Sequence, residues 1–309
     1  MEKNELINIE NKLNSKKVFM AFTLVFIAYI IASGVAIGIG YLLFNLIHPL
    51  VLILILDVIA TVIIFIFTII FNNVSFYDPY WSIKPIIIAI YWLICGINNG
   101  YNFNRLIRQI LILSLVSFWG IRLTANWIRS WKGLKHEDWR YIKYRKENHK
   151  IFWLIAFIGL VMMPTLLVYL GCISMYPALV SSTKEFNYLD IIALIITISA
   201  ILIEFIADEQ LFVFSKVNID PSKVMNIGLW GFSRHPNYFG EISFWWGLFF
   251  FALGADYSYW WTICGPIIMV FLFLFISIPL MEKYQIAKRK EYINYKKKVS
   301  MLIPWFPRK

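Results

Sequence analysis

The sequence has few charged residues for its length, and this scarcity is the first guide to its class. Asp, Glu, Lys and Arg make up 15% of the 309 residues, whereas a soluble domain carries about 25%. Hydrophobic residues make up 60% of the chain and aromatic residues 18%. The composition excludes a soluble globular protein and indicates an integral membrane protein.

Cysteine and phosphate-binding glycine loops are also scarce. Cys95, Cys172 and Cys264 lie in separate apolar runs, which favours buried hydrophobic positions over a zinc motif, and no metal site is expected. The glycines of residues 34–40 follow no expected strand, as a dinucleotide fingerprint would require, and no Walker loop occurs. A nucleotide would therefore have to bind through a helical geometry.

Long apolar runs are what the sequence has in abundance. A membrane helix needs about 20 apolar residues, and eight runs approach or exceed that length, two of them being short. We therefore expect an all-α fold, a polytopic membrane helical bundle with seven or eight transmembrane helices, and prefer eight. The expected spans are 18–47, 50–71, 84–98, 107–128, 151–173, 188–212, 240–256 and 260–281.

The positive charges are concentrated in two segments of a chain with net charge +11. Residues 129–150 contain eight Lys or Arg against three acids, and residues 282–309 contain nine against two. Because basic loops stay in the cytoplasm, both segments are expected there, and an even number of spans places the N-terminus there too. Basic segments that flank membrane helices need no nucleic acid partner, and none is expected.

The densest polar cluster lies where the chain re-enters an apolar stretch. Arg234, His235, Asn237, Tyr238 and Glu241 fall within eight positions. Ionisable groups beside a membrane segment are unfavourable, which indicates a functional site. The Arg-His-Pro turn can present donors to a phosphate, and the Asn and the Glu lie one helical turn apart on one face. The arrangement suits a ligand with phosphates and amide or ribose groups.

The segment Asp78-Pro79-Tyr80 precedes the third expected span. The start of a helix fully explains an Asp followed by Pro, because the Asp can be the N-cap and the Pro can occupy the first turn. The neighbouring aromatic side chains also suit a membrane interface. A catalytic role for the acid and the phenol is the other interpretation.

Two arginines and two acids lie near the ends of other expected helices. Arg122 and Arg129 share one helical face, and the deeper Arg122 requires a carboxylate or a phosphate. Glu204 and Asp208 are one turn apart and repel each other unless a cation or a hydroxyl-rich ligand lies between them, or unless they pair with the arginines. A ligand site and a structural ion pair both remain open here.

These motifs together resemble a known family. Residues 228–241 resemble the signature of the steroid 5-alpha-reductase superfamily, and most closely its bacterial 5-alpha-reductase-like membrane proteins. The resemblance covers roughly residues 72–307, so we divide the chain into N-terminal membrane helices without signature (1–71) and a catalytic domain (72–309). Supporting matches are residues 78–83, 119–122, 208 and 282–305.

The Arg-His-Pro step is shared with isoprenylcysteine carboxyl methyltransferases and phospholipid methyltransferases, which bind S-adenosylmethionine there. The continuation Asn-Tyr-Phe-Gly-Glu is typical of the reductases. The resemblance implies NADPH in a cytoplasm-facing cavity and hydride transfer to the β-carbon of a lipid-soluble enone, while an acid polarises the carbonyl oxygen. The cofactor residues that it implies are Arg122, Asp208, Arg234, His235, Asn237, Tyr238 and Glu241.

The proton-donor positions depart from that family. Steroid 5-alpha-reductases have a Tyr three residues before the membrane Arg, and the residue at that position in this sequence is Trp119. Their Gln-Glu pair is replaced here by the segment around Asp78. Because an indole does not donate a proton as a phenol does, the acid is expected at Asp78, Tyr77 or Tyr80. The substrate class extends from steroids to other isoprenoid or lipid enones. The catalytic candidates are Asp78, Tyr80 and the position of Trp119.

Two other functions stay open. One is an S-adenosylmethionine-dependent methyltransferase acting on a lipid or a prenylated cysteine, and the other is a non-catalytic sterol-binding or lipid-binding bundle whose donor positions have changed. In all three interpretations the partners are a lipid-soluble small molecule and membrane lipids, and the oligomeric state is left open.

Overall fold

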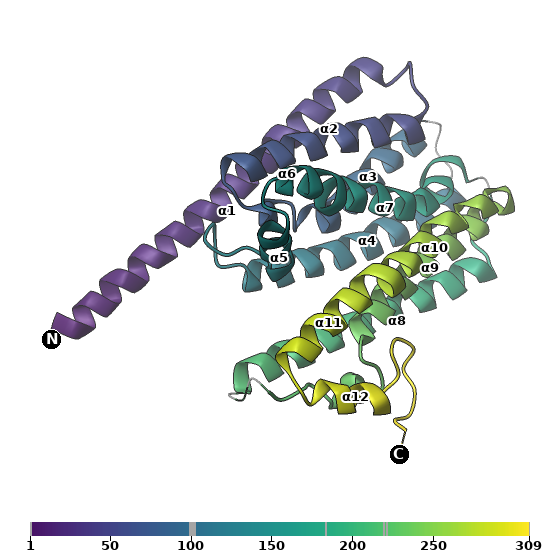
Figure 1. The fold of residues 1–309 in the computed structure, drawn as a ribbon. Helices are drawn as coiled ribbons and strands as arrows, with labels where there is room; N and C mark the ends of the chain where they lie inside the picture. Colours follow the sequence, from purple (N-terminus) through teal and green to yellow (C-terminus); the bar gives the residue numbers. More distant parts are fainter. Residues whose placement is uncertain (1, 99–102, 183, 219, 221, 309) are drawn as a thin grey trace. The chain divides into compact units, whose positions relative to one another are not determined.

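The computed structural model describes residues 2–98, 103–182, 184–218, 220 and 222–308. The regular structure in these ranges is helical, without strands and with one isolated parallel bridge between Ser233 and Ser300, as the ribbon in Figure 1 shows. The prediction of an all-α helical fold is confirmed.

The chain forms two compact units that are not contiguous in sequence. The first unit is Met1–Ile88 with Gly120–Tyr169, and the second unit is Ala89–Trp119 with Leu170–Lys309. Three helices, α3 (Tyr80–Asn98), α4 (Phe103–Ser130) and α7 (Met163–Cys172), contain residues of both. The predicted boundary after residue 71 marks the start of the family resemblance and not the edge of a compact unit. It stays a prediction.

In the first unit α1 (Glu2–Leu43) packs against α2 (Pro49–Ile70). α2 begins where Nδ1 of His48 accepts the backbone N–H of Leu50 at 3.3 Å. Pro49 occupies the first helical position, where its missing N–H is not needed. The other elements of this unit are η1 (Val74–Phe76), α5 (Trp139–Glu147), α6 (Phe152–Ile155) and the π-helical turn η2 (Ala156–Met162).

The second unit is centred on α8 (Tyr188–Val217) and α9 (Pro236–Ala255), which pack closely along their lengths. This approach depends on a glycine of α9, because a Cβ added at Gly240 would lie 2.8 Å from the carbonyl oxygen of Ala200. The other elements are η3 (Ile173–Met175), η4 (Pro177–Ser181), η5 (Gly228–Gly231), η6 (Tyr257–Ile263), α10 (Cys264–Phe271), η7 (Leu272–Ser277), α11 (Ile278–Lys288) and α12 (Tyr292–Lys298).

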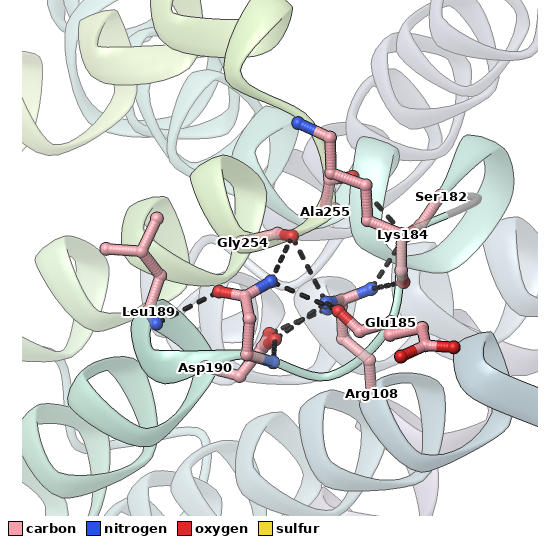
Figure 2. Close-up of polar contacts among 9 residues, drawn as sticks. Arg108, Ser182, Lys184, Glu185, Leu189, Asp190, Gly254 and Ala255 are labelled. Carbon is pink, nitrogen blue, oxygen red and sulfur yellow. Dashed lines mark hydrogen bonds and ion pairs between the residues drawn. The ribbon is translucent and has the colours of Figure 1, made fainter.

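A fully buried ion pair fixes the far end of α9. Arg108 of α4 donates from Nε and Nη2 to the two carboxylate oxygens of Asp190 in α8, at 2.7 and 2.6 Å. Nη2 also donates to the carbonyl oxygen of Gly254 at 3.2 Å. Nη1 and Nη2 of Arg108 also donate to residues of the loop that precedes α8, as Figure 2 shows. These residues are Ser182, Lys184 and Glu185. A buried pair with this many hydrogen bonds is a structural joint, and it sets the position of the helix that carries the polar cluster.

Seven helices within the described ranges are long and apolar enough to cross a membrane. They fit a multi-pass integral membrane protein, within the predicted seven or eight spans. The expected span at 240–256 forms as α9 but is not among the seven, because its polar first turns lower its hydropathy. The seven are Ser15–Leu43, Pro49–Ile70, Val74–Asn98, Arg105–Ser130, Phe152–Ser181, Tyr188–Val217 and Tyr257–Lys288.

Candidate functional site

The turn that leads into α9 is pinned to α8. Gly228 has a φ of +60°, a left-handed conformation that favours glycine, and a Cβ there would lie 2.4 Å from Nε2 of Gln210. Oε1 of Gln210 accepts the backbone N–H of Leu229 at 2.9 Å, and Nε1 of Trp230 donates to the carbonyl oxygen of Ala207 at 3.0 Å. The Gly-Leu-Trp part of the motif therefore positions the polar residues that follow it.

Arg234 binds the C-terminal segment of the second unit. Its Nε donates to Oε1 of Glu282 at 2.7 Å, and its Nη1 donates to the carbonyl oxygens of Lys296 and Val299, each at 2.8 Å. Nζ of Lys296 donates to Oε2 of the same Glu282 at 2.5 Å. These contacts commit much of the guanidinium to the protein, and the role of Arg234 as a phosphate partner stays a prediction.

His235 lies between Arg234 and the first turn of α9. Its ring stacks on the ring of Tyr238, with centroids 5.2 Å apart and planes 7° from parallel. Its Nε2 lies 3.5 Å from Oε1 of Glu282. Burial lowers the pKa of His235 and outweighs the opposing effect of Glu282. The imidazole is therefore neutral at neutral pH.

A cavity of about 150 Å³ opens beside these side chains. Ligand pockets commonly measure about 300–1,000 Å³, so this cavity suits one part of a dinucleotide, such as a base or a phosphate. The polar groups on its wall include hydrogen-bond donors and side-chain amides. Among them, Nη1 of Arg289 donates to Oε1 of Gln285. Its lining residues are Leu211, Phe214, Val224, Met225, Trp230, Arg234, His235, Asn237, Tyr238, Met281, Gln285, Arg289, Tyr292 and Tyr295.

Asn237 connects the cavity wall to α8. Its Nδ2 donates to Oδ1 of Asp208 at 3.4 Å, and its own Oδ1 accepts the backbone N–H of Tyr238 at 3.1 Å. The structure therefore brings together two residues, Asn237 and Asp208, that the sequence predicted separately as cofactor contacts.

Glu241 lies one turn deeper in α9 and is buried. Its Oε2 accepts the indole N–H of Trp119, and its Oε1 accepts that of Trp245, both at 2.9 Å. The ring of Trp119 stacks on Phe244 with centroids 4.6 Å apart. Two indole donors hold the carboxylate in one orientation, so Trp119 acts here as a hydrogen-bond donor to Glu241.

Asp78 is held by a phenol of the first unit. α3 begins at Tyr80, two residues after Asp78, and the Asp78 carboxylate accepts the hydroxyl of Tyr141 at 2.6 Å. The expected helix start with Asp78 as N-cap and Pro79 in the first turn is not what forms. Burial, together with the charge of Asp78, raises the pKa of Tyr141, so this phenol stays a donor.

Tyr80 lies beside two charged residues, Asp57 and Lys84, that the sequence analysis missed. Its hydroxyl lies 2.8 Å from Oδ1 of Asp57 in α2, and Nζ of Lys84 lies 3.4 Å from the same oxygen. All three residues are buried. Their signal in the sequence was a lone acid and a lone lysine, each inside an apolar run.

The predicted site residues divide between the two units. Contacts within the second unit join Trp119 to Glu241, Asn237 to Asp208 and His235 to Tyr238. The second unit holds Trp119, Asp208, Arg234, His235, Asn237, Tyr238 and Glu241. The first unit holds Asp78, which is half-buried, and Tyr80 and Arg122, which are buried.

One family model covers the range that carries these residues. The family described as "Protein of unknown function (DUF1295)" matches residues 64–299, which include every predicted site residue. An "Uncharacterized protein" of Schizosaccharomyces pombe is 28% identical over 258 residues, covering 75% of this chain and 73% of that protein. No solved structure matches the chain.

Proposed function

Because the chain belongs to the family "Protein of unknown function (DUF1295)", which includes steroid 5-alpha-reductase-like proteins, we propose that it is a membrane reductase. It reduces a carbon–carbon double bond in a lipid-soluble enone, steroid-like or of another isoprenoid or lipid class, with NADPH as the hydride donor. Within the steroid 5-alpha-reductase superfamily it stands with the bacterial 5-alpha-reductase-like membrane proteins.

One observation carries the proposal most directly. The first turn of α9 places His235, Asn237 and Tyr238 on the wall of the cavity, and Glu241 follows on the same helix with both oxygens fixed by indole donors. This is the Asn-Tyr-Phe-Gly-Glu continuation in which the family resemblance separates hydride transfer from methyl transfer.

The residues of the cavity fit part of a nicotinamide dinucleotide. Arg289 and Gln285 offer donors for a phosphate, while Tyr238 and Tyr292 offer ring faces for a base. NADPH, when bound, supplies a hydride. The second unit then binds and orients the cofactor and excludes water from it. Asp208 and Arg122 are assigned to the cofactor on the resemblance alone.

The carboxylate of Glu241 has a defined task in this account. Its two indole contacts hold the carboxylate in one orientation, and its role in the proposal is to accept a hydrogen bond from the nicotinamide carboxamide. Asn237 adds an amide one turn away. Positioning of this kind is the protein's main contribution to cofactor chemistry.

We place both basic segments in the cytoplasm, so the cavity opens to the soluble cofactor pool. Counting α9 as an eighth crossing beside the seven apolar helices keeps both ends of the chain on that side. Reporter tags at the two ends, assayed for protease access in intact cells, test this orientation.

A cofactor-dependent thermal shift tests the assignment. The protein is purified in mild detergent, and its unfolding temperature is measured with NADPH, NADH or S-adenosylmethionine. NADPH is expected to raise the unfolding temperature, and Asn237→Ala or Glu241→Ala to abolish that rise. Asn294→Ala and Glu291→Ala, at exposed positions of the same unit, serve as matched controls and retain it. Stabilisation by S-adenosylmethionine without any by NADPH overturns the proposal in favour of a methyltransferase.

A further inference from the structure

The C-terminal segment of the second unit carries large apolar side chains that are exposed outside the apolar helices. The last of the seven apolar helices found in the described ranges ends at Lys288, and residues 289–308 continue beyond it. Trp305 is 69% exposed there and Phe306 is 76% exposed. With three neighbours they form what we call the C-terminal apolar patch. Its members are Phe232, Met301, Ile303, Trp305 and Phe306.

The patch is held in place by backbone hydrogen bonds and a ring contact. The N–H of Trp305 donates to the carbonyl oxygen of Phe232 at 2.9 Å, and the N–H of Arg234 donates to that of Ser300 at 2.8 Å. The rings of Phe232 and Phe306 meet edge to face, with centroids 6.0 Å apart. The exposure of these side chains is therefore a feature of a folded segment.

The patch lies beside the point where an apolar helix meets its first charge. Arg234, whose backbone N–H binds Ser300, also binds Glu282 through its side chain at 2.7 Å. Glu282 is the first charged residue of the apolar helix Tyr257–Lys288. The hydrocarbon core of a membrane gives way to the polar interface where such a run ends, and Trp is enriched at that interface. We therefore expect the patch at the membrane surface.

Basic side chains flank the patch. Residues 288–308 contain seven Lys or Arg against one acid. Lys297 and Lys298 of α12 are exposed, and the carbonyl oxygen of Lys298 accepts the backbone N–H of Arg308 at 2.8 Å, so the segment has basic residues before and after its apolar stretch. A cluster of about four to eight basic residues beside a membrane helix is typical of a site for anionic phospholipid headgroups.

The orientation of the chain in the membrane does not account for the patch. The rule that basic loops stay in the cytoplasm explains the lysines, but it does not explain exposed aromatic side chains beside them. The apolar side chains of the long helices can face hydrocarbon, whereas residues 301–306 lie beyond the last of these helices. An exposed apolar patch with a polar rim marks an interaction surface. An anionic lipid surface matches both its apolar and its positively charged parts.

We propose that the C-terminal apolar patch docks on the anionic phospholipid surface of the membrane in which the protein is embedded. The ring of Trp305 and its apolar neighbours enter the headgroup region, while Lys297 and Lys298 bind the phosphates of anionic lipids. The charge-dependent part of this attraction is screened by salt. The docking is a property of this segment and does not depend on which cofactor the cavity binds.

Docking has a consequence for the cavity of the second unit. The helix α12 contributes Tyr292 and Tyr295 to the cavity wall, and it also carries the docking lysines. The hydroxyl of Tyr295 donates to the carbonyl oxygen of Trp230 at 2.6 Å, which connects α12 to the turn before α9. Docking therefore restrains one wall of the cavity as well as the C-terminal segment.

The test uses the full chain in lipid nanodiscs and the fluorescence of Trp305. The discs contain phosphatidylcholine alone or an equal mixture with phosphatidylglycerol. In both, the same fraction of a phosphatidylcholine brominated on its acyl chains near the headgroup quenches tryptophans that reach the lipid. The quenching due to Trp305 is the difference between the wild type and Trp305→Phe. Trp260→Phe is the matched control, because Trp260 is 66% exposed near the other end of the apolar helix Tyr257–Lys288.

Trp305 is expected to be quenched, and more strongly with phosphatidylglycerol than without it. Combining Lys297→Gln with Lys298→Gln loses the additional quenching, and high salt has the same effect. Combining Lys297→Arg with Lys298→Arg keeps it, because the charge is retained. The quenching due to Trp260 is expected to be the same in both lipids.

Two results would overturn the proposal. Quenching of Trp305 that is equal in the two lipids, and unchanged by the Gln substitutions, excludes docking on anionic headgroups. Absence of quenching of Trp305 in both lipids shows that the patch faces away from the membrane, as a surface for a protein partner or a second copy of the chain would.

Discussion

Trp119 donates its indole N–H to Oε2 of Glu241 at 2.9 Å, and this contact gives the buried indole at position 119 a defined partner. The second oxygen of Glu241 accepts from Trp245, so the carboxylate is fixed from both sides. The position of Trp119 therefore serves cofactor orientation in our account.

Glu241→Gln is expected to destabilise the second unit. The amide NH₂ of Gln would face one of the two indole N–H groups, leaving a buried donor without an acceptor, which typically costs about 1–3 kcal/mol. Chemical denaturation followed by tryptophan fluorescence measures the change. The exposed Glu291→Gln is the matched control and is expected to unfold like the wild type. A Glu241→Gln protein as stable as the wild type contradicts the two-indole arrangement.

Arg234→Met is expected to release the C-terminal segment. The substitution removes the contacts to Glu282 and to the carbonyl oxygens of Lys296 and Val299, and breaking a buried charge pair costs up to about 3–5 kcal/mol. Hydrogen exchange at residues 296–300 should accelerate. Arg308→Met removes an exposed arginine of the same segment and should leave exchange there unchanged. Equal protection in both variants contradicts the assigned contacts.

Gly240→Ala is expected to disrupt the packing of α8 on α9. The new methyl group would lie 2.8 Å from the carbonyl oxygen of Ala200, and overpacking of this kind typically costs about 1–3 kcal/mol. Gly34→Ala is the control, because a Cβ added there meets nothing within 4 Å beyond the adjacent residues and backbone of its own helix. Thermal unfolding in detergent distinguishes the two. An unaffected Gly240→Ala protein refutes the close approach.

Stability is expected to fall as the pH drops below the usual pKa of histidine. Burial lowers the pKa of His235 from its ordinary value of 6.5, so the unfolded chain binds a proton there before the folded chain does. The contribution of the neutral ring is fully present above pH 6.5 and is lost as the pH falls from there through the folded pKa. Unfolding temperatures between pH 5 and pH 8 should show a shallower pH dependence in His235→Gln. The control His149→Gln changes an exposed histidine and should show the pH dependence of the wild type. A His235→Gln protein with the same pH dependence as the wild type contradicts a buried neutral imidazole.

The apolar spans were predictable from the sequence because each is a local property of about 20 residues. The run at 188–212 became α8, which extends to Val217. The run at 84–98 was drawn too short, because Tyr80, Trp81 and Ser82 lower the hydropathy of the first turn of a helix that begins at Tyr80. A helix boundary predicted from hydropathy is therefore wrong where polar residues occupy the first turn of the helix.

The contacts of the polar residues were beyond sequence reasoning. Arg234 was predicted to meet a phosphate, yet its acceptors include Glu282, 48 residues away. Asp57 lies in a segment that carried no family signature, and its pairing with Lys84 depends on how α2 packs against α3. Spacing along one helix identifies which residues share a face, but the partner across a helix interface is set by tertiary packing.

The most direct test of the central claim follows two labels in the same membranes. Membranes containing the protein are given NADPH deuterated at the transferable C4 position, S-adenosylmethionine with a labelled methyl group, and three lipid-soluble enones, namely a 4-en-3-one steroid, a polyisoprenoid enone and a long-chain alkenone. The account predicts deuterium at the β-carbon of a reduced product, absent with Asn237→Ala, and no methyl label above that of membranes without the protein. Methyl label in a lipid product, without deuterium in any ketone, would contradict it.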